Sequence, residues 1–153
     1  MPKLHWIALK GRLEKGYRVA SGPSEAYPDY GSIVKQKPFF KKLGLDLDKM
    51  FNGTLNVSIH PHKFAMEKPE HAFNNVNWTE LTNAEDFSFS RCRIRFQGRE
   101  YYGWVYYPDP KTKKAHFQSA STLELLMPFI AGIAYGDEVE ISLNSTEIKI
   151  VFP

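Results

Sequence analysis

One seven-residue segment alternates so regularly between apolar and polar side chains that it constrains the fold more than any other part of the chain. Leu55, Val57 and Ile59 occupy every second position of residues 54–60, and polar side chains fill the positions between them. Because successive side chains of a β-strand point to opposite sides of a sheet, this pattern predicts a strand with one apolar face and one polar face. The rest of the chain must supply the sheet to which this strand belongs.

Other strand-like segments run through the whole sequence. They are expected at residues 4–10, 16–21, 87–96, 100–107, 116–119, 138–143 and 146–152. Turn residues at 11–15, 97–99 and 144–145 predict three hairpins, which pair 4–10 with 16–21, 87–96 with 100–107, and 138–143 with 146–152. The apolar phase slips between Phe89 and Cys92, which predicts a bulge. Residues 122–130 fit either a helix or a buried strand, although Pro128 argues against a continuous helix.

Helical and loop segments are few. Pro38 near the start and Gly44 at the end predict a short helix at residues 37–44, with Phe39, Phe40 and Leu43 on its buried side. Residues 22–35 have the composition of a loop. Residues 61–86 are expected to form a long, functional loop with a short strand at 76–81. These elements predict one mainly β domain over residues 1–153, a small barrel or sandwich with one or two short helices.

Composition excludes several classes of protein. A hydrophobic fraction of 42% rules out a disordered chain, and no apolar run approaches the length of a membrane span. The N-terminus lacks the apolar stretch of a signal peptide, and the single cysteine, Cys92, excludes an internal disulfide framework. A cytoplasmic protein is therefore expected. Its exposed strand edges would permit a homodimer, and the sequence leaves the oligomeric state open.

Charge and reactive side chains give weak functional signals. The net charge is only +3, although residues 1–49 hold ten Lys/Arg and five Asp/Glu and would suit an anionic ligand. Arg91, Arg93 and Arg95 share one strand face, for which a solvated surface is favoured over nucleic-acid binding. Residues 60–62, His-Pro-His, favour a surface turn over a metal pair, and Cys92 favours a buried apolar role over a nucleophile. Phosphate-loop, nucleophile-elbow and zinc-protease motifs are absent from the sequence.

The start of the alternating segment carries the most specific chemistry. Thr54 and Asn56 are two residues apart, so their side chains point the same way, about 6.6 Å apart along the strand. Hydroxyl and amide oxygens are neutral, hard ligands that magnesium accepts, and Gly53 allows a close approach of the backbone. An exposed polar strand face is the alternative interpretation, and spacing alone favours it.

The same residues resemble a known family. Gly53-Thr54-Leu55-Asn56 is similar to the signature motif of the archaeal-type, CTP-dependent riboflavin kinases. Weaker similarities follow in the family's order: residues 39–44 before the motif, then 97–103, 123–128 and 136–141 after it. The resemblance covers roughly residues 9–141.

The resemblance implies a cradle-loop β-barrel that transfers a phosphoryl group from CTP or another nucleotide to riboflavin, giving FMN. It implies that Thr54 and Asn56 hold magnesium against the nucleotide phosphates, with Gly53 beside them. Glu124 would contact the flavin and accept the proton of the reacting hydroxyl. His116 stands at the position of a flavin-contacting threonine. Gly16 and Gly22 stand in the region of the family's glycine-rich nucleotide loop.

Three departures from the family pattern leave a second interpretation open. The close glycine spacing is missing around Gly16 and Gly22, His116 replaces the threonine, and residues 129–135 replace a Leu-Arg stretch that contacts the nucleotide. The protein is therefore expected to be either a phosphotransferase or a non-catalytic barrel of the same type that binds a small ligand or a partner protein. Nucleic-acid binding through the arginine face is a third and weaker interpretation.

Overall fold

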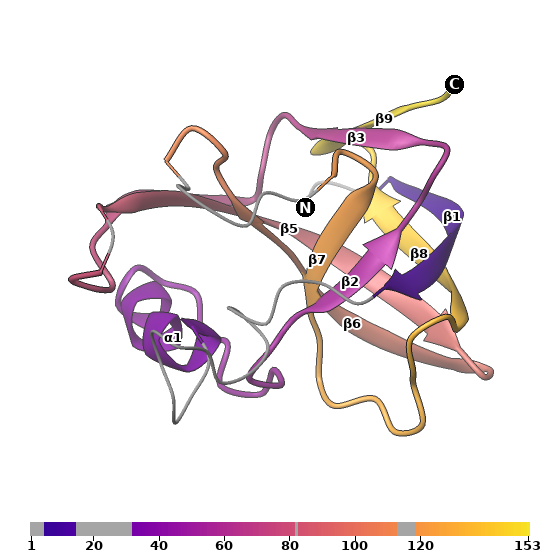
Figure 1. Cartoon of the computed structure of the whole chain (residues 1–153), viewed down its shortest axis with the longest axis horizontal. Helices are drawn as coiled ribbons and strands as arrows, with labels where there is room; N and C mark the ends of the chain where they lie inside the picture. The colour runs from indigo at the N-terminus through magenta and orange to yellow at the C-terminus, as the bar shows by residue number, and fades with distance from the viewer. Residues whose placement is uncertain (1–4, 15–31, 82, 113–118) are drawn as a thin grey trace.

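The protein is a closed β-barrel with a helix packed on its outside (Figure 1). The computed structural model describes residues 5–14, 32–81, 83–112 and 119–153. In these residues the elements are β1 (Trp6–Glu14), α1 (Ser32–Lys42), β2 (Leu55–Ser58), β3 (Lys63–Met66), β4 (His71–Val76), β5 (Glu85–Phe96), β6 (Arg99–Pro108), β7 (Thr122–Leu126), β8 (Glu138–Asn144) and β9 (Ile148–Val151). The prediction of a mainly β barrel is confirmed.

Six of these strands form the ring. Hydrogen bonding runs in the order β5–β6–β7–β2–β1–β8, and β8 pairs again with β5 to close it. All of the pairings are antiparallel. β4 extends the sheet beyond β5, and β3 pairs with β9 in a separate ribbon across one end of the barrel (Figure 1).

Two apolar clusters lie on opposite sides of the barrel wall. The inner cluster fills the barrel with side chains that include Val57, Ile59, Leu123 and Leu125. The outer cluster joins Phe40 of α1 to Phe87 and Phe89 of β5, whose ring centroids lie 5.1 and 5.0 Å from that of Phe40. The predicted faces of residues 54–60 are confirmed, because Val57 and Ile59 point into the barrel and Leu55 packs against the same cluster.

The outer cluster explains why the predicted bulge in β5 is wrong. The register of β5 with β6 is unbroken from Phe87 opposite Pro108 to Phe96 opposite Arg99. Phe87 and Phe89 belong to the outer cluster, whereas Cys92 belongs to the inner one. The alternation of apolar residues in β5 therefore shifts because one part of the strand packs into the outer cluster and the other part into the inner cluster.

Several predicted boundaries are also wrong, each for a packing reason. β1 continues through Gly11 to Glu14, because both β2 and β8 pair with this stretch. The long loop predicted at residues 61–86 instead contains β3 and β4 and ends in the start of β5. β3 pairs with β9, and β4 pairs with β5. The short strand expected at 76–81 is wrong, because β4 ends at Val76. Residues 122–126 are a strand, which settles the choice left open there. The hairpin at Gln97 and Gly98 is confirmed, and both residues have positive φ.

The predicted helix begins earlier than expected. α1 starts at Ser32, so Pro38 lies inside it and removes one helical hydrogen bond. Only Phe40 of the three residues expected on the buried side is buried, whereas Phe39 and Leu43 are exposed. The buried positions are Ser32, Ile33, Gln36, Lys37 and Phe40, which follow the helical period from a start at Ser32.

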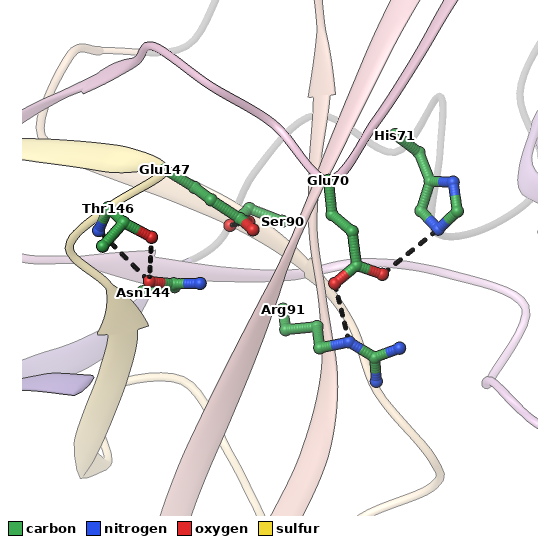
Figure 2. Close-up of polar contacts among 7 residues, drawn as sticks. All are labelled: Glu70, His71, Ser90, Arg91, Asn144, Thr146 and Glu147. Atoms are coloured by element: carbon green, nitrogen blue, oxygen red, sulfur yellow. Dashed lines mark hydrogen bonds and ion pairs between the residues drawn. The ribbon is translucent and has the colours of Figure 1, made fainter. Parts of the chain in front are cut away.

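The predicted final hairpin is wrong, and Figure 2 shows where β8 ends. The Asn144 side chain accepts hydrogen bonds from the backbone N–H and the hydroxyl of Thr146, at 3.1 and 2.8 Å. The next residue, Glu147, then accepts a hydrogen bond from the hydroxyl of Ser90 on β5. This turn directs β9 away from β8 and onto β3.

Cys92 is expected to be inert in the folded protein. It is 1% exposed inside the barrel, and burial raises the pKa of its thiol. The thiolate is the reactive form, so a maleimide or disulfide reagent at pH 8 should label Cys92 only after the protein is unfolded in denaturant. Rapid stoichiometric labelling of the native protein would contradict the closed barrel.

Candidate functional site

The loop before β2 is held in place from two sides. The Lys37 ammonium of α1 donates to the backbone oxygen of Met50 at 2.6 Å and to Oδ1 of Asn52 at 2.7 Å. Burial lowers the pKa of Lys37. From the other side, the Phe51 N–H donates to the Met127 oxygen at 2.8 Å. These contacts fix the chain immediately before Gly53 and Thr54.

Thr54 and Asn56 line one pocket, as their spacing predicts. This pocket, called here the polar pocket, has a volume of about 380 Å³, and Leu13, Phe51 and Tyr135 contribute to its wall. The Thr54 and Asn56 side chains are 7% and 5% exposed. Among the residues that the structure describes, the Thr54 Oγ1 is one of two buried side-chain polar atoms without a hydrogen-bond partner. A buried hydroxyl without a partner costs about 1–3 kcal/mol, and its place in a pocket wall suits an oxygen that holds a ligand.

Polar residues on four neighbouring strands lie in one row across the outside of the barrel. Asn56 of β2 is opposite Glu14 of β1 on one side and Glu124 of β7 on the other. Glu124 is in turn opposite Tyr106 of β6. Directly paired residues of antiparallel strands project from the same face, so this row places an amide between two carboxylates, with a phenol at its end.

The far end of the row is buried beneath α1. Tyr106 is 4% exposed, and its hydroxyl donates to Oε1 of Gln36 at 2.7 Å. Burial raises the pKa of Tyr106 well above its ordinary value, and the charge of Glu124 raises it further. Tyr106 is therefore a neutral neighbour of the Glu124 carboxylate at physiological pH.

The structure thus brings together three of the residues singled out in the sequence. Thr54, Asn56 and Glu124 occupy adjacent strands or the loop that leads into them, and Gly53 precedes Thr54 in that loop. Gly16, Gly22 and His116 lie outside the described residues. Sequence reasoning missed Glu14, because the segment was interpreted as a turn, and it missed Lys37, Gln36 and Tyr106, because only the three-dimensional packing brings α1 to the row.

The arginine face of β5 is occupied by contacts within the protein. Arg91 donates through Nε to Glu70 at 2.9 Å, and the same carboxylate contacts His71 (Figure 2). The Arg91 guanidinium also lies over the Trp104 ring, at 4.6 Å from its centre. Arg93 bonds to Ser142, and Arg95 to Glu100. The Arg91 and Arg95 side chains remain about half exposed within these ion pairs, which supports the interpretation of a solvated surface.

Within the described residues, no group of three or more His, Cys, Asp or Glu side chains is arranged to hold a metal. His60 and His62 therefore find no third ligand of these types there. The donor set at Thr54 and Asn56 is of another kind, because its oxygens are neutral and magnesium completes its shell with water and phosphate. An unpartnered hydroxyl beside an amide fits such a cation.

Neither a protein-family model nor a curated protein matches this chain. In the described part of the chain, no helix has the length and apolar character needed to cross a membrane.

Proposed function

We propose that the protein is a magnesium-dependent phosphotransferase that moves the terminal phosphoryl group of a nucleoside triphosphate, CTP or another, to riboflavin, giving FMN. The unpartnered Thr54 hydroxyl in the wall of the polar pocket carries the proposal. Asn56 in the same wall and Glu124 in register with it support the proposal, since a phosphate site and an acceptor site must adjoin.

Each residue has a separate role in the proposed reaction. The Thr54 and Asn56 oxygens hold the cation, which when bound neutralises phosphate charge. The terminal hydroxyl of the ribityl chain attacks the γ-phosphorus, a new oxygen–phosphorus bond forms, and the bond to the bridging oxygen breaks. The nucleoside diphosphate leaves, and the Glu124 carboxylate accepts the hydroxyl proton. Lys37 positions Thr54 through its contact with Asn52.

A barrel that binds a flavin without turnover is the second candidate. The burial of Glu124, which is only 9% exposed, favours this second candidate. A carboxylate that accepts the proton must lie within hydrogen-bond reach of the riboflavin hydroxyl. Riboflavin fluorescence distinguishes the two candidates. Quenching without FMN formation in the presence of magnesium and nucleotide supports the second candidate and rejects the first.

Glu124→Gln tests the proton-accepting role. The amide keeps the shape of the side chain but cannot take the proton, so kcat should fall about 10²- to 10⁴-fold. Riboflavin should still bind, and its fluorescence should still be quenched by the variant. Glu140→Gln, an exposed carboxylate on β8, is the control and should leave kcat unchanged. FMN formation measured by chromatography gives the rates. An unchanged kcat in Glu124→Gln would remove this role from Glu124.

A further inference from the structure

A second pocket adjoins the polar pocket and has a different chemical character. This apolar pocket has a volume of about 230 Å³, and its lining includes Phe51, Leu55, Met127, Pro128, Phe129 and Ile133. Phe51, Leu55 and Ile133 line both pockets. A cavity of roughly 150 Å³ holds a benzene ring, so the apolar pocket has room for a heteroaromatic ring.

Two exposed aromatic side chains line this pocket, and a third lines the adjoining one. Phe51 is 52% exposed and Phe129 is 70% exposed, and their ring centroids lie 6.0 Å apart. Tyr135, which lines the polar pocket, is 69% exposed. Large aromatic side chains usually bury most of their surface, and exposed faces of this kind provide a platform on which a planar ring stacks.

The apolar pocket offers little for recognising the edge of a base. None of the lining side chains named above carries a strong hydrogen-bond donor or acceptor. The backbone N–H of Phe51 and the backbone oxygen of Met127 are bonded to each other, and Pro128 has no N–H. The side chains of this pocket can therefore hold a ring only by stacking and apolar contact.

We infer that the apolar pocket binds the base of the donor nucleotide by stacking, and that the protein accepts purine and pyrimidine nucleotides alike. This inference rests on the proposed function, because the polar pocket would hold the triphosphate of the same molecule. Because the polar and apolar pockets share part of their walls, one nucleotide can place its triphosphate in the first and its base in the second. Apolar pockets discriminate weakly between related ligands, whereas pockets that hydrogen-bond a ligand discriminate by 10⁴ or more.

Calorimetric titrations with the magnesium complexes of ATP, GTP, CTP, UTP and inorganic triphosphate test this inference. The four nucleotides should bind with Kd values within about tenfold of one another. Phe51→Ala and Phe129→Ala should each weaken all four by about 5- to 150-fold, as loss of base stacking does. Phe129 lines only the apolar pocket, so Phe129→Ala should leave the Kd of inorganic triphosphate unchanged. Phe152→Ala removes an aromatic side chain that is 57% exposed and belongs to neither pocket, so it is the matched control.

The outcomes separate this inference from the proposed function. Preference for one base by more than about 100-fold, or unchanged nucleotide Kd values in both phenylalanine variants, would overturn the stacking pocket even if FMN forms. Unselective binding that depends on both phenylalanines, without FMN formation, would support the pocket and overturn the kinase. Failure of every nucleotide to bind the parent protein would overturn both.

Discussion

Thr54→Val should lower kcat/KM for phosphoryl transfer to riboflavin by at least about 100-fold while leaving the protein equally stable or more stable. Valine has nearly the shape of threonine but lacks the oxygen proposed to hold magnesium, whose charge stabilisation amounts to several kcal/mol. The Thr54 hydroxyl is buried without a partner, so its removal relieves a desolvation cost of about 1–3 kcal/mol. Asn56→Ala should lose activity to a similar extent.

Thr122→Val is the matched control for the stability measurement. Thr122 is 8% exposed, as Thr54 is 7%, but its hydroxyl donates to Glu14 at 3.1 Å. Its replacement should therefore lower the free energy of unfolding by about 1 kcal/mol. Thermal unfolding should show opposite shifts for the two valine variants. A large loss of stability in Thr54→Val, or wild-type turnover in both Thr54→Val and Asn56→Ala, would contradict the assignment of these residues to a ligand site.

Gly103→Ala should prevent closure of the barrel between β6 and β7. A Cβ atom at Gly103 would lie 2.1 Å from the Leu126 backbone oxygen and 2.7 Å from the Met127 sulfur. The neighbouring backbone cannot move away without breaking the pairing of the two strands. The free energy of unfolding should fall by about 3 kcal/mol or more, which lowers Tm by about 6–12 °C in a domain of this size.

Gly98→Asn tests whether any glycine substitution would have this effect. Gly98 has a φ of +75°, and a Cβ atom there meets nothing within 4 Å. Asparagine tolerates this backbone conformation better than other side chains, so its cost should stay within about 1 kcal/mol. Circular dichroism melts of the two variants would settle the comparison. A wild-type Tm for Gly103→Ala would show that β6 and β7 do not approach as closely as described.

The sequence predicted features that depend on neighbours along the chain. The alternation at 54–60 and the turn at Gln97 and Gly98 are local patterns, and both are confirmed. Which strands pair with one another depends on closure of the ring, and a pattern of neighbouring residues does not predict this pairing. β9 has the same alternation whether it pairs with β8 or with β3, and the turn at Asn144 and the contacts of Glu147 direct it to β3.

The same distinction between local and long-range features applies to the residues of the candidate site. The spacing of Thr54 and Asn56 predicted that they share a face, and they line the same pocket. The position of Glu124 opposite Asn56 depends on the pairing of β2 with β7, which are far apart in the chain. Glu14 and Tyr106 join the row through two further pairings, so the sequence alone could not bring them to the site.

Transfer of a labelled phosphoryl group to riboflavin is the direct test of the proposed phosphotransferase. Purified protein is incubated with riboflavin, magnesium and each of the four γ-³²P-labelled nucleoside triphosphates, and the label in FMN is measured after chromatography. The proposed phosphotransferase should give labelled FMN, and the label should disappear when EDTA removes the magnesium and when Thr54 is replaced by valine. Absence of label in FMN with every nucleotide, or label that persists in Thr54→Val, would contradict it.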